Sequence, residues 1–164
     1  MINVLFVCLG NICRSPSAES IFSAQVKAAG LDDRISCDSA GTYGYHQGEP
    51  ADRRMQKHAR RRGYSLDSIS REFDPSTDFS FFDYIIGMDD DNIHALKTAD
   101  HAGKYAHKIF RMTDFTKTDV YQSVPDPYYG GDQGFEIVLD ILEDACEGLL
   151  ARIKHELSGT ASGR

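Results

Sequence analysis

The sequence predicts an α/β fold with a parallel sheet at its centre. Residues 2–8 form a nearly continuous apolar run, which is typical of a strand buried on both faces of a parallel sheet. Further apolar runs alternate with helical stretches, and right-handed connections between such strands make them parallel. The C-terminal part repeats apolar residues at steps of three or four, which indicates a helix with one buried face.

The first element is followed by signals for a loop and then a helix. Ser15 is a good N-cap, Pro16 suits the first helical position, and Gly30 is placed to end a helix of about four turns. The same kind of reasoning predicts three further strands and two further helices. The strands are at 35–39, 82–88 and 108–110, and the helices are near 51–62 and 90–101.

The last helix has the clearest pattern. Its predicted buried face consists of Phe135, Val138, Leu142, Ala145, Leu149, Ile153 and Leu157. Cys146 lies beside this face, and we expect it to be packed in the core. Residues 158–164 have nothing to bury, so we expect one domain over residues 1–157 followed by a disordered tail.

Composition excludes several classes of function. Lys and Arg total 18 against 25 Asp and Glu, and the net charge of −7 argues against binding to nucleic acid or to an anionic membrane. The N-terminal apolar run is too short for a membrane span and lacks signal-peptide features, so we expect a cytoplasmic protein. The four cysteines show no zinc-type pairing and the six histidines are scattered, so we expect thiols, no metal and no cofactor.

The segment from Cys8 to Ser15 lies where α/β proteins bind anions, between the end of a buried strand and the start of a helix. Successive backbone amides can form a nest around a tetrahedral oxyanion, and the planar fork of Arg14 can hold two of its oxygens. Gly10 and Asn11 tolerate the unusual backbone angles that such a loop needs. Amides, helix N-terminus and guanidinium would all favour the thiolate of Cys8, which makes it a candidate nucleophile.

The spacing between Cys8 and Arg14 is weak support by itself, because a chain of this composition produces it by accident roughly one time in four. The plainer interpretation of a lone cysteine is a small buried hydrophobe. The position between a buried strand and a helix opened by Ser15 and Pro16 favours the catalytic interpretation instead.

The run Val4-Leu-Phe-Val-Cys-Leu-Gly-Asn-Ile-Cys-Arg-Ser-Pro16 resembles the signature of the low-molecular-weight protein tyrosine phosphatases. Three later segments resemble that family in the expected order: Ser39-Ala-Gly-Thr42 with nearby His46 and Gly48, Phe82-Asp-Tyr-Ile85 leading to Met88-Asp89, and Asp126-Pro-Tyr-Tyr129. The likeness extends from residue 2 to about residue 155. It implies a four-stranded parallel sheet flanked by helices on both faces, and hydrolysis of phosphotyrosine in proteins by a monomer or weak dimer.

The resemblance also implies roles for particular residues. Cys8 would be the nucleophile, Asp126 would protonate the tyrosyl oxygen as it leaves and later activate water, and the phosphate would be bound by the loop residues Leu9, Gly10, Asn11, Ile12, Cys13 and Arg14. Asn11, Ser15 and Ser39 would support the loop, and Cys13 would pair with Cys8 on oxidation. The aromatic substrate cleft would be lined by Ile12, Tyr43, Tyr128 and Tyr129. Without the family, Asp126 is an ordinary turn residue before proline.

The sequence departs from the family where many members carry His-x-x-Arg before the third strand, because this chain has Ser68-Ile-Ser-Arg71. Ser68 or Ser70 would have to replace the histidine that supports the loop asparagine. A basic stretch (Arg53, Arg54, Lys57, Arg60, Arg61 and Arg62) could attract acidic substrates, but a solvated helix face is the plainer interpretation.

Three other functions compete with phosphotyrosine hydrolysis. Protein-arginine phosphatases resemble this family but tend to have Thr where Ile12 stands, and the bulky Ile12 favours an aryl phosphate. Thiol-dependent arsenate reductases need extra cysteines that relay a disulfide, and Cys37 and Cys146 are far apart in sequence. A phosphate-binding module without activity would usually lack the nucleophile or the acid, and both are present.

Overall fold

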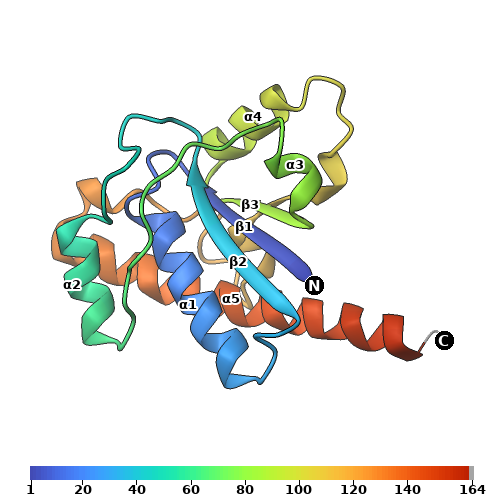
Figure 1. The fold of residues 1–164 in the computed structure, drawn as a ribbon. Coiled ribbons are helices and arrows are strands. Elements are labelled where there is room, and N and C mark those ends of the chain that lie inside the picture. Colours follow the sequence, from blue (N-terminus) through green and yellow to red (C-terminus); the bar gives the residue numbers. More distant parts are fainter. Residues whose placement is uncertain (163–164) are drawn as a thin grey trace.

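The structure, a computed structural model, describes residues 1–162, apart from the side chains of Tyr129 and of residues 160–162. Strands and helices alternate along the chain as the sequence predicted (Figure 1). The elements are β1 (Ile2–Cys8), α1 (Arg14–Ala28), β2 (Ile35–Gly41), α2 (Arg53–Arg61), α3 (Asp78–Phe81), β3 (Tyr84–Gly87), α4 (Asp90–Ala99), β4 (Ile109–Arg111) and α5 (Gly131–Ser162). Short 3-10 helices occupy Ala106–Lys108 (η1), Met112–Phe115 (η2) and Pro127–Tyr129 (η3).

The four strands form one parallel sheet in the order β2-β1-β3-β4. β1 lies between β2 and β3, and its register runs from Ile2 beside Ile35 to Cys8 beside Gly41. β1 therefore ends at the carboxyl edge of the sheet. Because β2 lies on one side of β1 and β3 on the other, the order of the strands reverses direction at this point. This is the place where open parallel sheets bind ligands.

Successive residues of β1 point to opposite faces of the sheet, and both faces are covered. Val4 and Phe6 pack in the core formed with α1 and α5, whereas Leu5 and Val7 pack with α3 and α4 through Phe79 and other buried residues. All four side chains of β1 named here are fully buried. Burial on both faces explains why this strand reads as a continuous apolar run.

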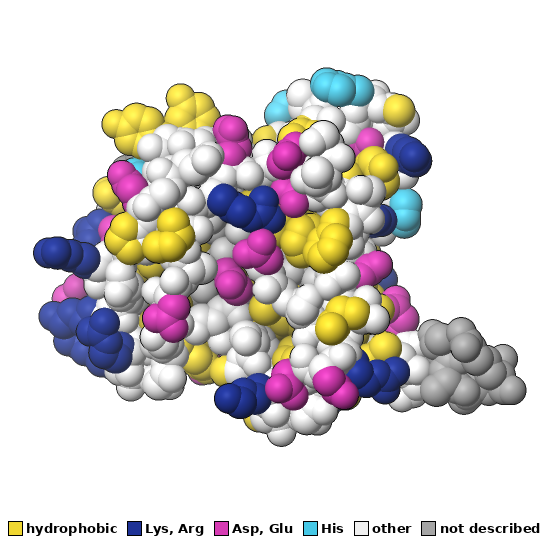
Figure 2. Space-filling view, in the orientation of Figure 1, with side chains coloured by type: hydrophobic (Ala, Val, Ile, Leu, Met, Phe, Trp, Pro, Cys, Tyr) yellow, Lys and Arg dark blue, Asp and Glu magenta, His cyan; other side chains and the backbone are white. Residues whose placement is uncertain are grey.

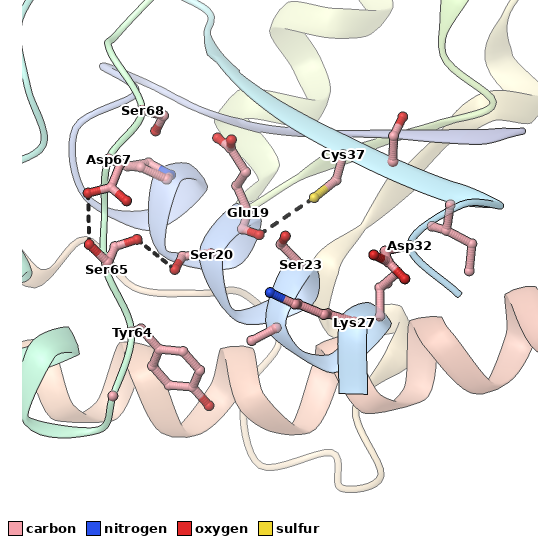
Figure 3. A pocket seen from close by; sticks show the side chains of 16 residues that line it. Glu19, Ser20, Ser23, Lys27, Asp32, Cys37, Tyr64, Ser65, Asp67 and Ser68 are labelled. Carbon is pink, nitrogen blue, oxygen red and sulfur yellow. Dashed lines mark hydrogen bonds between the residues drawn. The ribbon is translucent and has the colours of Figure 1, made fainter. Parts of the chain in front are cut away.

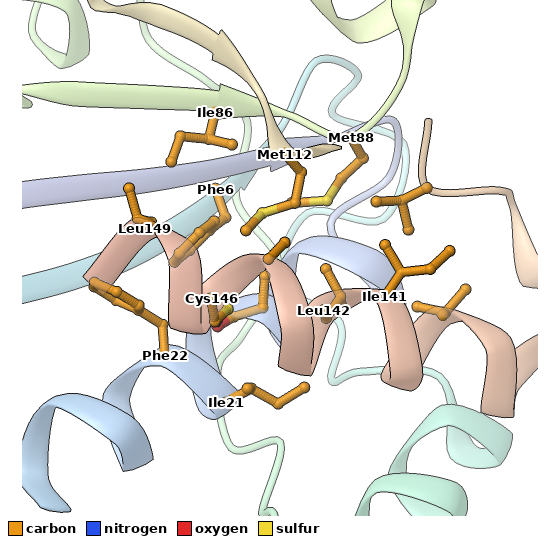
Figure 4. Close-up of a cluster of buried hydrophobic side chains, with 14 of the residues drawn as sticks. Phe6, Ile21, Phe22, Ile86, Met88, Met112, Ile141, Leu142, Cys146 and Leu149 are labelled. Carbon is orange, nitrogen blue, oxygen red and sulfur yellow. The ribbon is translucent and has the colours of Figure 1, made fainter. Parts of the chain in front are cut away.

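α5 closes the larger core, as its sequence pattern predicted. Figure 4 shows Leu142, Cys146 and Leu149 of this helix in one buried cluster with Phe6 of the sheet and Phe22 of α1. Cys146 is fully buried, which confirms its packing role. Every member of the predicted apolar face is buried except Leu157, which is partly buried.

Three local expectations were wrong or incomplete. α1 begins at Arg14 with Cys13 as its N-cap, so Ser15 lies inside the first turn and does not cap the helix. α5 continues through Ser162, into the segment predicted as a disordered tail, and residues 163–164 of that segment lie outside the described residues. α3 and the 3-10 helices were not predicted, because one turn of helix has no periodic pattern. None of the described helices has the length and apolar character needed to cross a bilayer.

Candidate active site

The loop between β1 and α1 has an unusual backbone conformation at one residue. Asn11 adopts a left-handed conformation with φ of 57°, as predicted for this loop. Gly10 does not have a positive φ; a side chain there would instead approach the ring of His46, with 3.0 Å between the added Cβ and Cδ2. Cys13 makes no side-chain capping bond at the start of α1. The first N–H groups of this helix can therefore face an anion held in the loop.

The side chain of Cys8 lies at the base of this loop, in contact with Ser15. The two side-chain atoms Cys8 Sγ and Ser15 Oγ are 3.0 Å apart, and Asn11 Nδ2 donates to Ser15 Oγ at 2.8 Å. Ser15 and Asn11 are both buried. Ser15, which the sequence predicted as the N-cap of α1, instead contacts Cys8 and accepts a hydrogen bond from Asn11.

Arg14 is buried and fixed by groups far away in the sequence. Its Nη1 donates to Asp89 Oδ2 at 2.6 Å and to the carbonyl of Val124 at 3.0 Å. Burial acts to lower the pKa of Arg14, but the charges of Cys8 and Asp89 and the hydrogen bond to Asp89 outweigh it and raise the pKa. Asp89 was not predicted as a site residue, although its place directly after β3, at the carboxyl edge of the sheet, is a signal that could have identified it.

A cleft of about 280 Å³ opens above the loop. Its floor is formed by Cys8, Leu9, Gly10, Ile12, Cys13 and Arg14. Its walls are formed by Tyr43, Tyr45, His46, Asp126 and Tyr128. The structure therefore brings the predicted Cys8, Arg14, Asp126, Ile12, Tyr43 and Tyr128 to one place. Tyr45 and His46 were not predicted as wall residues. The side chain of Tyr129 lies outside the described part of the structure.

Asp126 is exposed at the edge of this cleft, where it also forms a turn. Its Oδ1 accepts a hydrogen bond from the Tyr128 amide at 3.0 Å, so it caps η3, and Pro127 occupies the first position of that turn. The amide of Val124 donates to the carbonyl of Met88 at 2.8 Å, which ties the segment to the end of β3. Asp126 therefore both forms this turn and lines the cleft.

The loop is braced by the segment after Ser68, in which Ser70, one of the two predicted residues, contacts Gly10 rather than the asparagine. The amide of Arg71 donates to Asn11 Oδ1 at 3.0 Å, and Ser70 Oγ donates to the carbonyl of Gly10 at 3.0 Å. Ser70 thus contacts the loop, whereas Ser68 lies at a second hollow toward which the Glu19 side chain points (Figure 3). The backbone of Arg71 holds the asparagine, and no side chain is needed in the role of the missing histidine.

Ser39 does not contact the loop directly among the described hydrogen bonds. Its Oγ donates to Glu19 Oε1 at 2.5 Å. Glu19 lies on α1 beside a second, polar hollow of about 600 Å³, in which its side chain points toward Ser68 (Figure 3). Burial raises the pKa of the Glu19 carboxyl, although the hydrogen bonds from Ser39 and Ser68 act in the opposite direction. Any support that Ser39 gives to the loop acts through α1.

The other three cysteines differ from Cys8 in their surroundings. Burial raises the pKa of the Cys13 thiol far above its usual range, and the nearby Asp52 adds to this effect. Burial also raises the pKa of Cys37 to about 12 and that of Cys146 well above its usual value. Cys13 lines the cleft, whereas Cys37 lines the second hollow and Cys146 lies in the core. All four are free thiols.

Comparisons with known proteins agree with this geometry. The sequence profile of the family described as low molecular weight phosphotyrosine protein phosphatase matches residues 3–159. A protein assigned to the low molecular weight protein-tyrosine-phosphatases in Synechocystis sp. is 51% identical over 154 residues, which cover 94% of this chain and 98% of the relative. The low molecular weight protein-tyrosine-phosphatase YfkJ of Bacillus subtilis is 44% identical, with 95% of this chain and 98% of the relative covered.

Solved structures give the same result. The crystal structure of a protein tyrosine phosphatase from Entamoeba histolytica superposes with a TM-score of 0.90 at 49% identity, and 95% of this chain and 99% of that chain are covered. These matches cover nearly the whole chain and include the loop that holds Cys8 and Arg14. The chain belongs to the low molecular weight phosphotyrosine protein phosphatase family.

Proposed function

We propose that this enzyme hydrolyses phosphotyrosine in proteins, and small aryl phosphates, through a cysteinyl-phosphate intermediate. One observation carries the proposal: a single cleft is lined by a nucleophile candidate, a cation and a carboxyl group, namely Cys8, Arg14 and Asp126. A phosphate on the loop floor would face all three. Tyr43 and Tyr128 also line this cleft, and their flat rings suit contact with the phenyl ring of a phosphotyrosine.

In the first step, the Cys8 thiolate attacks phosphorus. An S–P bond forms while the bond between phosphorus and the tyrosyl oxygen breaks, and Asp126 gives its proton to that oxygen. The backbone amides of Leu9 to Arg14 and the Arg14 guanidinium bind the phosphoryl oxygens, whose charge is spread over a trigonal array in the transition state. Arg14 is suited to this because Asp89 and the Val124 carbonyl hold only its Nη1.

In the second step, water hydrolyses the intermediate. Asp126, now a carboxylate, takes a proton from the attacking water, the S–P bond breaks, and Cys8 leaves as a thiolate. The Ser15 hydroxyl can donate to that sulfur, because its oxygen already accepts a hydrogen bond from Asn11. Inorganic phosphate is the product, and the enzyme returns to its starting state.

The remaining roles rest on position. Asn11 and Ser15 support the loop directly, and Ser39 acts through Glu19. Cys13 lines the cleft beside Cys8, so we assign it the role of protecting the nucleophile by forming a disulfide with it on oxidation. The same disulfide would block activity until a reductant restores both thiols.

The test of the nucleophile and the acid uses two variants. Cys8→Ser should abolish hydrolysis of p-nitrophenyl phosphate while calorimetry still detects phosphate binding, because the amides and Arg14 are unchanged. Asp126→Ala should slow turnover on the order of 100-fold for aryl phosphates with poor leaving groups, and much less for good ones, because only a basic leaving oxygen needs a proton.

Asp119→Ala provides the matched control, because Asp119 is an exposed carboxylate on the preceding loop that does not line the cleft. It should behave as the wild type with every leaving group. Turnover by the Cys8 variant would remove Cys8 from the mechanism. A loss in Asp126→Ala that is the same for all leaving groups would remove its role as the acid.

The structure gives less support to the alternatives. Ile12 lines the cleft, and an apolar side chain there suits a phenyl ring better than a phosphoguanidine. Cys37 and Cys146 do not line the cleft, so a disulfide relay of the arsenate-reductase kind has no obvious path to Cys8. Phosphotyrosine-containing proteins are the partners that we propose, for a cytoplasmic monomer or weak dimer that binds neither nucleic acid nor membrane.

A further inference from the structure

α2 presents a strongly basic face to solvent. Its five exposed cations are Arg53, Arg54, Lys57, Arg60 and Arg61. At 3.6 residues per turn these five positions fall within an arc of about 120°, opposite the buried positions of the helix. Figure 2 shows Lys and Arg side chains gathered at the end of the molecule where α2 lies in Figure 1. We call these five residues the basic face.

The sixth cation of the stretch serves the fold instead. Arg62 follows α2 directly and donates to Glu136 at 2.8 Å and to Glu143 at 2.5 Å, and its Nη2 lies 2.9 Å from Asp140. It thereby ties α2 to α5. By contrast, in the part of the chain that the structure describes, no ion pair is recorded for Arg53, Lys57, Arg60 or Arg61.

Stability of the helix does not explain the basic face. Cations are favourable in the last turn of a helix, where Arg60 and Arg61 lie, but they oppose the helix dipole in the first turn. Arg53 and Arg54 occupy that first turn, which contains no acidic residue, and the only nearby compensation is the N-cap Asp52. Two cations at the unfavourable end of a helix, of which Arg53 has no recorded ion pair in the described part of the chain and Arg54 pairs only with Asp52, indicate a function outside the fold in a chain of net charge −7.

The N-terminal end of α2, where cations are unfavourable for the helix, is the end next to the cleft. The amide of Asp52 donates to the carbonyl of Ile12 at 2.8 Å, so the start of α2 is anchored to the phosphate-binding loop. The Arg54 guanidinium lies over the ring of Tyr128, 4.8 Å from its centre, and Tyr128 is a wall of the cleft. From there the basic face extends away from the cleft for about 13 Å, the length of a nine-residue helix. An extended peptide covers that distance in about four residues.

We propose that the basic face binds acidic residues of the substrate within about five positions of the phosphotyrosine, and so gives the enzyme a preference for acidic phosphoproteins. This inference rests on the proposed function, because the phosphotyrosine must occupy the cleft while its neighbours lie along α2. We choose acidic segments as the partner because their negative charge is complementary to the positive charge of the basic face. A local cationic surface raises the encounter rate with acidic segments that the overall negative charge of the chain would otherwise repel.

The test compares two triple variants with the same change in net charge. R53Q/K57Q/R61Q removes three cations of the basic face and leaves Arg54, which packs on Tyr128. K27Q/R34Q/K154Q removes three exposed cations near the C-terminal end of α1, where Arg34 and Lys154 line a separate hollow. The substrates are two phosphotyrosine peptides that differ only in three flanking Asp or Asn residues, and p-nitrophenyl phosphate.

We expect the wild type to prefer the Asp peptide, and R53Q/K57Q/R61Q to lose about tenfold in kcat/KM for that peptide at low ionic strength. Its kcat/KM for the Asn peptide and for p-nitrophenyl phosphate should stay unchanged, as should all values for K27Q/R34Q/K154Q. Added salt should reduce the preference of the wild type. A loss confined to one substrate also excludes misfolding as its cause.

Equal treatment of the two peptides by the wild type would overturn the inference, and so would equal losses in the two triple variants. It would also be overturned if R53Q/K57Q/R61Q lost only binding to phosphatidylserine vesicles, since the face would then serve a membrane. Failure of the wild type to hydrolyse p-nitrophenyl phosphate would instead overturn the proposed function itself.

Discussion

The hydroxyl oxygen of Ser15 lies 3.0 Å from the sulfur of Cys8, and the same oxygen accepts a hydrogen bond from Asn11 at 2.8 Å. A serine hydroxyl has one proton to donate, and an amide N–H can only donate. The Ser15 proton is therefore available to the sulfur, with the Ala40 carbonyl as a weaker alternative at 3.5 Å. This arrangement favours a negatively charged sulfur both before attack and after the S–P bond breaks.

Ser15→Ala should lower kcat for aryl phosphates by roughly 10- to 100-fold, because a hydrogen bond to a charged group contributes about 1.5–3 kcal/mol. Steady-state and single-turnover kinetics together measure which of the two chemical steps slows. Ser20→Ala is the matched control, since this hydroxyl of the same helix donates to the carbonyl of Ser65, away from the loop. Equal rates in the two variants would show that Ser15 contributes only to packing.

Asp89→Asn should lower kcat/KM for aryl phosphates by about tenfold and the free energy of unfolding by about 1–3 kcal/mol. Both effects follow from the charge pair that Asp89 makes with the buried Arg14. Asparagine remains a good N-cap, so the start of α4 should be preserved. Kinetics and chemical denaturation provide the two measurements.

Asp90→Asn is the control for this change. Asp90 occupies the next position in the chain, and both it and its partner Arg111 are exposed, so solvent screens the pair and it contributes little to stability. If Asp89→Asn were as active as Asp90→Asn, the proposed fixing of Arg14 by Asp89 would be wrong.

The sequence was sufficient for features whose causes are local. The seven residues of β1 and the apolar face of α5 carry their burial in their own pattern, and both were placed correctly. The pairing of Arg14 with Asp89 joins residues 75 positions apart, and no spacing rule indicates it. Ser15 was misread because a hydroxyl near a helix start can equally cap the helix or turn toward a neighbouring sulfur, and only the fold decides between them.

The walls of the cleft show the same limit. Tyr45 and His46 lie in an irregular segment without a period, so no residue pattern indicated that they line the cleft beside Cys8, although His46 belongs to a segment that resembles the family. Ser70 and Ser68 are two residues apart, yet Ser70 hydrogen-bonds the loop whereas Ser68 lines the second hollow beside Glu19. Which of two neighbouring hydroxyls meets the loop depends on the path of the backbone rather than on residue type.

Alkylation should distinguish Cys8 from the other cysteines. At pH 7, iodoacetamide should label Cys8 first and phosphate should prevent it, because raised pKa values keep Cys13, Cys37 and Cys146 as thiols. Peptide mapping by mass spectrometry measures the label at each position. Rapid labelling of Cys37 at neutral pH would contradict its raised pKa.

The raised pKa of Cys37 also predicts a loss of stability in alkaline solution. Its folded-state value of about 12 lies above the ordinary value of 9.0, so the unfolded chain releases this proton first. The stabilisation is complete below about pH 9 and is lost as the pH rises toward 12. Thermal unfolding between pH 9 and 11 should show a smaller decline for Cys37→Ala than for the wild type. An identical decline in both would exclude Cys37 as a cause.

Ile12 should decide between phosphotyrosine and phosphoarginine as substrate. Its side chain lines the cleft, and the amide of Asp52 holds its backbone carbonyl at 2.8 Å, so a substitution there changes the cleft surface and keeps the loop path. Ile12→Thr should lower kcat/KM for a phosphotyrosine peptide by roughly 3- to 10-fold, because apolar contact with the phenyl ring is lost. The ratio of phosphoarginine to phosphotyrosine hydrolysis should rise.

Ile12→Val separates polarity from size, because valine and threonine have nearly the same shape. The valine variant should keep the phosphotyrosine preference of the wild type, with only a small loss for the missing methylene. If valine and threonine changed the ratio equally, the size of the side chain would set the preference. If neither changed it, the choice of the tyrosyl group would depend on the walls formed by Tyr43 and Tyr128, and Ile12 would only complete the core beneath the cleft.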